Sequence, residues 1–312
     1  MNKTIGILLM AYGTPRSLDE VETYYTHIRR GNKPPQPLLD ELIGRYKAIG
    51  GVSPLNEITD EQARKLEQTL NVKDSRYKVY IGMKHAAPFI ADAVRRMAAD
   101  GIEKAVGIVL APHYSTMSVG VYTKEALEAA EEALMKLHCV SSWHMEDAFL
   151  DALEERLREA LEKFSEEERR QLKVVFSAHS LPERILALGD PYPEQLLETS
   201  RALASRLLID DWQFAWQSAG RTAEPWLGPD LLVVMGELAE KGYRAMLSCP
   251  IGFVADHLEV LYDLDIEAQQ HASQKGIHFE RTASLNADQR MIDALVAAIH
   301  RVEREINPSG AR

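Results

Sequence analysis

The sequence predicts an α/β fold of two similar lobes, each a four-stranded parallel sheet flanked by helices. The first observation is that eight short apolar, β-branched segments bounded by Gly, Pro or Ser alternate with amphipathic helical segments. The second is the length of 312 residues, which exceeds the usual size of a single core and favours two domains of roughly 150 residues. The third is that the segments form two sets of four, with similar turns after corresponding strands.

In chain order, the first set of strands is expected at 5–10, 77–83, 105–110 and 139–143. The second set is expected at 174–177, 213–217, 245–249 and 277–282. The first strand of each set ends in a small polar signature, MAYGT or SAHSLP, and the third ends in a proline turn, LAPHYST or SCPIGFVAD. The similar turn sequences after corresponding strands indicate two lobes that arose by duplication.

Helices are expected between the strands, where apolar residues recur every three or four positions. These segments are 59–70, 89–100, 123–137, 146–164, 193–207 and 230–241. A long amphipathic helix over 288–305 ends the chain and is expected to pack back on the first lobe. The predicted domains are therefore an N-terminal lobe at 1–145, a C-terminal lobe at 146–285 that holds a metal site, and a C-terminal helix at 286–312.

The lobes differ mainly by an insertion at 15–55 in the first. In an otherwise acidic protein this insertion is rich in basic side chains, namely Arg29, Arg30, Lys33, Arg45 and Lys47. Long excursions of this kind are typical of lids and binding loops. The alternative is that these are surface charges that pair with Asp40, Glu41 or Glu57.

Composition excludes several classes of protein. A net charge of −11 disfavours nonspecific binding of nucleic acid or of anionic membranes. No segment approaches the roughly 20 apolar residues of a membrane span, and the N-terminus lacks a signal peptide. With only Cys139 and Cys249, neither a disulfide framework nor a four-cysteine iron–sulfur cluster is expected. A reducing, cytoplasmic location follows.

A row of acidic side chains follows the seventh predicted strand. After the break at Pro250 and Gly252, the residues Asp256, Glu259, Asp263 and Glu267 recur at spacings of three, four and four. At about 3.6 residues per turn they share one side of a helix, where like charges repel by a few tenths of a kcal/mol per pair. The row predicts a bound cation, with Asp256 as a helix cap; a solvated surface is the alternative.

Two further side chains lie at predicted strand ends, where open α/β sheets bind ligands. His179 follows the fifth strand, and beside carboxylates it suits an exchangeable metal site or a proton relay, unless it is purely structural. Tyr12 follows the first strand. His85 and His113 are interpreted as structural. Because the chain lacks a glycine-rich phosphate loop, a Walker sequence and a G-x-S-x-G elbow, hydride transfer and ATP hydrolysis are disfavoured.

Long motifs in nearly the whole chain resemble the ferrochelatase family, most closely its bacterial coproporphyrin branch. They are LLMAYGTP, YYTHIRRG, RYKAIGGVSPL, YIGMKH, LAPHYST, SAHSLPERI, GDPYPEQL, WQSAGRTAEPWLGPD and GFVADHLEVLYDLD. The resemblance implies two Rossmann-like lobes with a porphyrin cleft between them. It also implies insertion of Fe²⁺, as substrate metal, without an organic cofactor.

Site residues are carried over motif by motif. The resemblance implies that His179 and Glu259 bind the metal and that Tyr12 approaches it from the opposite porphyrin face. Asp263 and Glu267 match an acidic row that can hold a second, hydrated divalent ion such as Mg²⁺. Implied porphyrin contacts are Tyr12, Arg29, Arg45, Tyr46, Ser53 and Tyr122. No role is assigned to Arg30.

The basic insertion favours the more anionic porphyrin, because Arg binds carboxylates in a bidentate manner. Coproporphyrin carries four propionates and protoporphyrin two. The predicted function is thus insertion of Fe²⁺ into coproporphyrin III in heme biosynthesis, with release of two protons. Alternatives are a protoporphyrin IX ferrochelatase, a cobalt chelatase, and a non-catalytic tetrapyrrole or metal carrier. A monomer with transient contacts to neighbouring heme-pathway enzymes is expected, with no nucleic acid and no membrane span.

Overall fold

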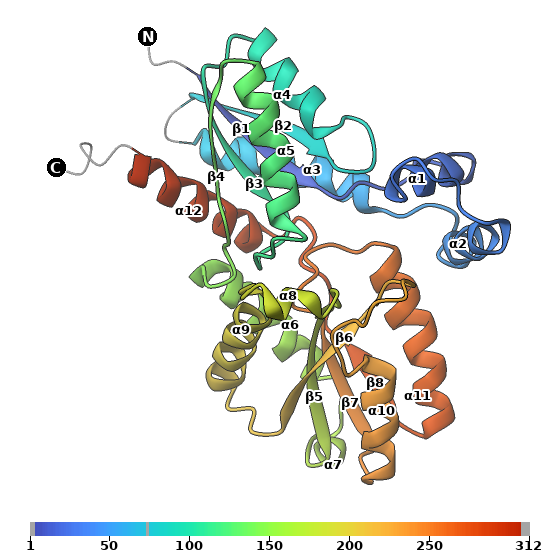
Figure 1. Cartoon of the computed structure of the whole chain (residues 1–312). Helices are drawn as coiled ribbons and strands as arrows, with labels where there is room; N and C mark the ends of the chain where they lie inside the picture. Colours follow the sequence, from blue (N-terminus) through green and yellow to red (C-terminus); the bar gives the residue numbers. More distant parts are fainter. Residues whose placement is uncertain (1–3, 73–74, 307–312) are drawn as a thin grey trace.

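The computed structural model describes residues 4–72 and 75–306 and contains two parallel sheets of four strands each (Figure 1). The first has the order β2-β1-β3-β4 and the second the order β6-β5-β7-β8, so corresponding strands occupy corresponding places. The predicted fold class is confirmed. The strands are β1 (Ile5–Ala11), β2 (Tyr77–Met83), β3 (Lys104–Val109), β4 (Lys136–Cys139), β5 (Leu172–His179), β6 (Trp212–Gln217), β7 (Ala245–Cys249) and β8 (His278–Arg281).

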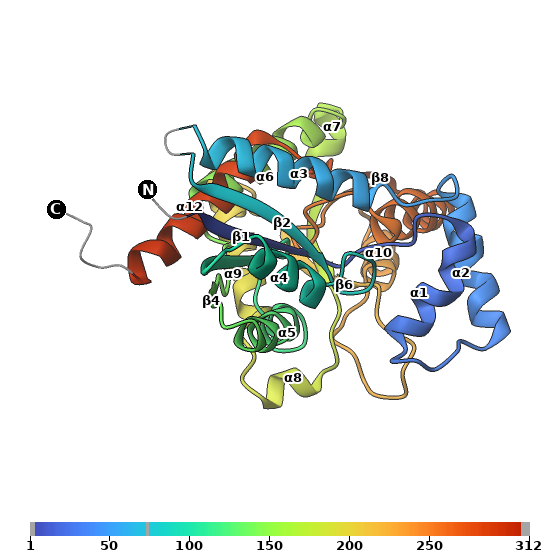
Figure 2. The ribbon, with the colours of Figure 1, turned by 90° about the horizontal axis from the view of Figure 1, so that it is seen from above.

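Helices cover both faces of the first sheet (Figure 2). Alternate residues of β1 point to opposite faces: Ile7 and Leu9 pack with α3 (Leu55–Leu70), whereas Leu8 and Met10 pack with α4 (Ile90–Ala99) and α5 (Val119–Glu132). This is why the strand is an uninterrupted apolar run, as expected for a sheet that is buried on both sides.

The second sheet is covered in the same manner. One face packs against α10 (Leu231–Glu240), the π-helix η2 (Glu259–Ala268) and α11 (Gln269–Lys275). The other faces α6 (Asp147–Leu161) and α9 (Tyr192–Leu207). The short helices are α7 (Glu166–Arg169) and α8 (Arg184–Ala187).

The lobes share one hydrophobic core rather than meeting as separate bodies. The last helix, α12 (Gln289–Ile306), buries Leu295 and Ile299 in a cluster that includes residues of β1, α3, α6 and β5. The relative position of the two sheets is therefore set by close packing. In residues 4–72 and 75–306, no helix combines the length and apolar character that a bilayer crossing requires.

The insertion predicted at 15–55 contains helices that the sequence analysis left unassigned. They are η1 (Leu18–Glu20), α1 (Val21–Ile28) and α2 (Gln36–Ala48). The two α-helices project from the first lobe (Figure 1) and have a small core of their own around Val21, Leu39 and Tyr46.

Two predicted boundaries are wrong in the first lobe. The helix expected at 123–137 is α5, which ends at Glu132, and the strand expected at 139–143 is β4, which begins at Lys136. Leu134 adopts a left-handed backbone conformation with φ of 54°, which ends the helix before the apolar pattern does. Lys136 then pairs with Lys104 of β3, and this pairing, rather than the local pattern, sets where the strand starts.

Candidate functional site

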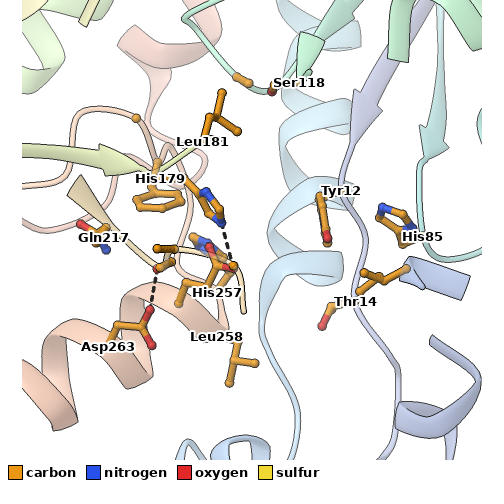
Figure 3. Close-up of a pocket in the computed structure, with 18 of the residues that line it drawn as sticks. Tyr12, Thr14, His85, Ser118, His179, Leu181, Gln217, His257, Leu258 and Asp263 are labelled. Carbon is orange, nitrogen blue, oxygen red and sulfur yellow. Dashed lines mark hydrogen bonds and ion pairs between the residues drawn. The ribbon is translucent and has the colours of Figure 1, made fainter. Parts of the chain in front are cut away.

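A pocket of about 980 Å³ lies between the lobes, at the carboxyl ends of both sheets. Tyr12 follows β1 and His179 ends β5, so the two parallel sheets bring residues far apart in the chain to one cavity. Figure 3 shows Tyr12 and His179 on opposite walls. Glu259 and Asp263 extend into the same pocket from η2.

The centre of the second-lobe wall is a histidine–carboxylate pair. Nε2 of His179 lies 3.6 Å from Oε1 of Glu259, and Oε2 of Glu259 lies 3.6 Å from Nε2 of His257. Nδ1 of His179 contacts the carbonyl oxygen of Ser180, which can only accept, so Nδ1 carries a proton. The lone pair on Nε2 and the carboxylate therefore converge on one point, and either a proton or a metal cation there satisfies both.

The electrostatics of this pair favour a cation. Burial alone would lower the pKa of His179, but the carboxylate of Glu259 raises it above its ordinary value. Burial alone would raise the pKa of Glu259, but His179 and His257 lower it below its ordinary value. Glu259 is thus an anion at neutral pH, and a divalent metal ion competes with the proton for the pair.

Tyr12 forms part of the opposite wall and is 43% exposed. Its ring packs against His85 with the centroids 4.6 Å apart. The enclosing walls and the nearby charge of Glu259 raise the pKa of Tyr12 above its ordinary value. At neutral pH Tyr12 is a neutral phenol whose oxygen is available to a ligand between the walls.

The acidic residues of the predicted row have different environments in the structure. Asp263 accepts a hydrogen bond of 2.5 Å from the Ser218 hydroxyl and pairs with Arg45 at 3.2 Å. Burial, with the charges of Glu259 and Glu267, raises the pKa of Asp263 to about 6, although Ser218 and Arg45 oppose that shift. Glu267 is exposed at the margin of the pocket.

The expectation that Asp256 caps the helix is wrong. Its carboxylate accepts hydrogen bonds from Arg281, Ser284 and Asn286, which tie it to the end of β8 and to the chain that follows. It precedes η2, and because η2 is a π-helix, with a wider turn than an α-helix, the row does not follow the 3.6-residue spacing assumed from the sequence.

Most residues named as porphyrin contacts line the pocket, from the first lobe and its insertion. Arg45 is held by Glu41, at 3.5 Å, as well as by Asp263, and the hydroxyl of the buried Tyr46 lies 3.0 Å from that of Thr14. Arg29 does not line the pocket, whereas Arg30, left open by the sequence, does. The predicted contacts in the lining are Tyr12, Arg45, Tyr46, Ser53 and Tyr122.

Several pocket residues were not assigned a role from the sequence. His257 could have been suspected, because it stands two positions before Glu259. Ser218, Lys84 and Arg221 carry no such signal, since they reach the pocket only through the tertiary fold. Within the part of the chain that the structure describes, no three His, Cys, Asp or Glu side chains converge in a geometry that could hold a metal ion. His179 and Glu259 form an open pair, which suits a metal that must leave again.

Comparisons with known proteins give the same family over nearly the whole chain. The family model described as Ferrochelatase matches residues 4–303. A coproporphyrin III ferrochelatase from Geobacillus sp. (strain WCH70) is 48% identical over 301 residues, covering 95% of this chain and 97% of the relative. The coproporphyrin III ferrochelatase of Anoxybacillus flavithermus is 49% identical, with 95% and 96% covered. Coproporphyrin III ferrochelatase 2 of Bacillus cereus is 46% identical, with 97% and 96% covered.

Solved structures share the fold at low sequence identity. The sirohydrochlorin chelatase SirB from Bacillus subtilis subspecies spizizenii, in complex with cobalt, superposes with a TM-score of 0.61 at 12% identity, covering 99% of this chain and 98% of that one. CbiX, described as the terminal enzyme of siroheme biosynthesis in denitrifying bacteria, has a TM-score of 0.53 at 11% identity, with 95% and 98% covered. These likenesses support the two-lobed architecture.

Proposed function

The chain belongs to the ferrochelatase family, and from that premise we propose that it inserts Fe²⁺ into coproporphyrin III and releases two protons. The observation that carries the proposal is the His179–Glu259 pair, which opens into a cavity of about 980 Å³ opposite Tyr12. A flat tetrapyrrole between these walls would have the metal pair on one face and the phenol on the other.

The same pair serves both halves of the reaction. Fe²⁺ binds where the Nε2 lone pair of His179 and the carboxylate of Glu259 converge, as a borderline metal prefers. As the iron moves to the four pyrrole nitrogens, two N–H bonds break and two protons leave the ring. The vacated pair can then accept one of these protons at the point that held the metal, and the second passes to water or to the outer acids Asp263 and Glu267. One metal ion is exchanged for two protons, so charge is conserved.

The charge around the pocket supports a porphyrin with several carboxylates. Five cationic side chains contribute to its lining, and they are Arg30, Arg45, Lys84, Arg184 and Arg221. Of these, Arg45 and Arg221 are held by Glu41, so that an incoming propionate would compete with a protein carboxylate for a bidentate partner. A porphyrin with four propionates can pair with more of these cationic side chains than a porphyrin with two. Arg29 stays a predicted contact.

The outer acids are proposed as a ladder for hydrated Fe²⁺ or departing protons, and as a place for Mg²⁺. Because Ser218 and Arg45 already engage Asp263, an ion beside Asp263 and Glu267 would keep its water shell and bind through it, as Mg²⁺ commonly does. A monomer, contacts with neighbouring heme-pathway enzymes and a cytoplasmic location stay predictions.

The test is anaerobic turnover followed by the Soret band. With Fe²⁺ and coproporphyrin III we expect many turnovers per protein, and a higher kcat/KM than with protoporphyrin IX. Stoichiometric trapping without turnover would indicate a carrier, and turnover with Co²⁺ alone would indicate a cobalt chelatase. A clear advantage for protoporphyrin IX would contradict the proposed substrate while leaving the chelatase activity in place.

A further inference from the structure

Away from the metal pair, a buried polar contact joins the two lobes; we call Ser115, Thr116 and Asp190 the interlobe latch. Ser115 and Thr116 lie in the first-lobe loop between β3 and α5, and Asp190 lies between α8 and α9 of the second lobe. One oxygen of Asp190, Oδ2, accepts hydrogen bonds from the Ser115 hydroxyl at 3.0 Å and from the Thr116 hydroxyl and backbone N–H, each at 2.7 Å. Figure 1 shows α8 at the boundary of the lobes.

Two of the three latch residues are buried, whereas Thr116 is exposed. Ser115 is 0% and Asp190 8% exposed. The second oxygen of Asp190 accepts the backbone N–H of Tyr192 at 3.0 Å, at the start of α9, where the helix dipole favours an anion. Removing the carboxylate would leave buried donors of both lobes without a partner.

The second-lobe side of the latch leads directly to the metal pair. The hydroxyl of Tyr192 donates to the backbone carbonyl of His179 at 3.1 Å, and its ring packs beside Trp216 at 5.9 Å. Asp190 therefore contacts the first lobe with one oxygen and, with the other, the residue that holds the backbone of His179. On the first-lobe side, the loop continues into α5, which carries Tyr122.

This arrangement matters because the two substrates are divided between the lobes. The proposed metal ligands, His179 and Glu259, belong to the second lobe. The porphyrin contacts implied by the family motifs all precede the second lobe in the chain, namely Tyr12, Arg29, Arg45, Tyr46, Ser53 and Tyr122. Of the five cationic side chains in the lining, only Arg184 and Arg221 belong to the second lobe. Insertion requires the two sets to face each other at a defined distance, and misplacement by about 1 Å can cost on the order of 100-fold in rate.

We propose that Asp190 is a positioning residue that sets where bound porphyrin lies relative to His179. This inference rests on the proposed function. It has a specific kinetic consequence. The metal pair lies within the second lobe and the motif-derived porphyrin contacts within the first, so each of these sets stays intact when the latch is broken, and we expect binding to be largely preserved while the chemical step slows. The insertion also joins the lobes across the pocket, through Arg45 with Asp263 and Arg221 with Glu41, and α12 packs on both, so loss of the latch does not separate them.

The experiment compares Asp190→Ala, Asp190→Asn and wild type. For Asp190→Ala we expect kcat to fall about 10- to 100-fold, with the porphyrin Kd from fluorescence quenching and the KM for Fe²⁺ both within about two-fold of wild type. Asp190→Asn keeps one acceptor oxygen and should recover part of kcat. Thr116→Val removes one of the three bonds from the first-lobe side and leaves the Ser115 hydroxyl and the Thr116 backbone N–H in place. It should therefore lower kcat in the same sense but by less than Asp190→Ala, and should add little to that variant.

The control is Asp211→Asn at the opposite end of β5 and β6, where Asp211 pairs with Lys173 and accepts from the Tyr243 hydroxyl at 2.8 Å. It should lower the melting temperature but leave kcat unchanged. If Asp190→Ala fails to fold, the double variant Ser115→Ala with Thr116→Val carries the test, because it removes both hydroxyl donors to Asp190. An unchanged kcat, or a loss of porphyrin affinity equal to the loss of rate, would overturn the inference. Absence of turnover in wild type would instead refute the proposed function.

Discussion

A buried histidine beside the latch predicts how stability depends on pH. His113 is 2% exposed; its Nε2 lies 2.9 Å from the Thr199 hydroxyl of α9, and its Nδ1 has no hydrogen-bond partner. The ring of His144, 5.4 Å away, is the nearest aromatic neighbour. Burial, with a smaller effect of His144, holds the pKa of His113 well below its usual range. The folded protein therefore keeps His113 neutral at moderately acidic pH.

The sign and size of the effect follow from linkage. In the unfolded chain the pKa of a histidine is about 6.5, so below that pH the unfolded state binds a proton that the folded state does not. This destabilises the folded state, and the loss grows as pH falls through about 6.5. Between pH 7.5 and pH 5.5, a single such group removes about 1.4 kcal/mol from the free energy of unfolding.

Urea unfolding at both pH values tests this prediction, with His113→Gln as the variant. The amide lowers stability at both pH values because the packing changes, but it should remove about 1.4 kcal/mol of the pH dependence. His138, exposed on β4, provides the matched control, and His138→Gln should retain the wild-type pH dependence. If His113→Gln retained the full wild-type difference, with the same m-value, the buried neutral state of His113 would be refuted.

The remaining predictions concern the pocket. Glu259→Gln removes the anion that the metal requires, so kcat should fall by at least about 100-fold. The porphyrin Kd from fluorescence quenching should stay within about two-fold of wild type. As a control, Glu237→Gln on the exposed face of α10 should change neither kcat nor Kd. Asp263→Asn with Glu267→Gln should lower kcat or raise the apparent KM for iron in steady-state assays, and if both constants are unchanged the outer acids have no part in ion or proton transfer. Arg45→Lys loses bidentate pairing, so kcat/KM should fall about 10-fold for coproporphyrin III and less for protoporphyrin IX, an order that equal losses would contradict.

Some site geometry could be foreseen because it depends on local signals. His179 and Tyr12 stand directly after apolar runs, and parallel strands bring their carboxyl ends to one edge. Glu259 follows a proline–glycine break that restarts the chain as a helix. Asp256 shows the limit of such reasoning, because its partners Arg281 and Asn286 lie 25 and 30 residues farther along the chain and outweigh the local capping preference.

The sequence by itself determined the two-sheet α/β architecture, the family motifs and the strand ends at which Tyr12 and His179 lie, because side-chain periodicity and turn residues act over a few positions. Only the tertiary structure decided that α5 ends before Leu134, that Arg30 lines the pocket while Arg29 does not, and that Asp190 joins the lobes. The Asp190 contacts join residues 74 and 75 positions apart, and the end of α5 depends on the left-handed backbone of Leu134. Such contacts leave no periodic signal, so the alignment of the two substrate sites could be recognised only in the folded molecule.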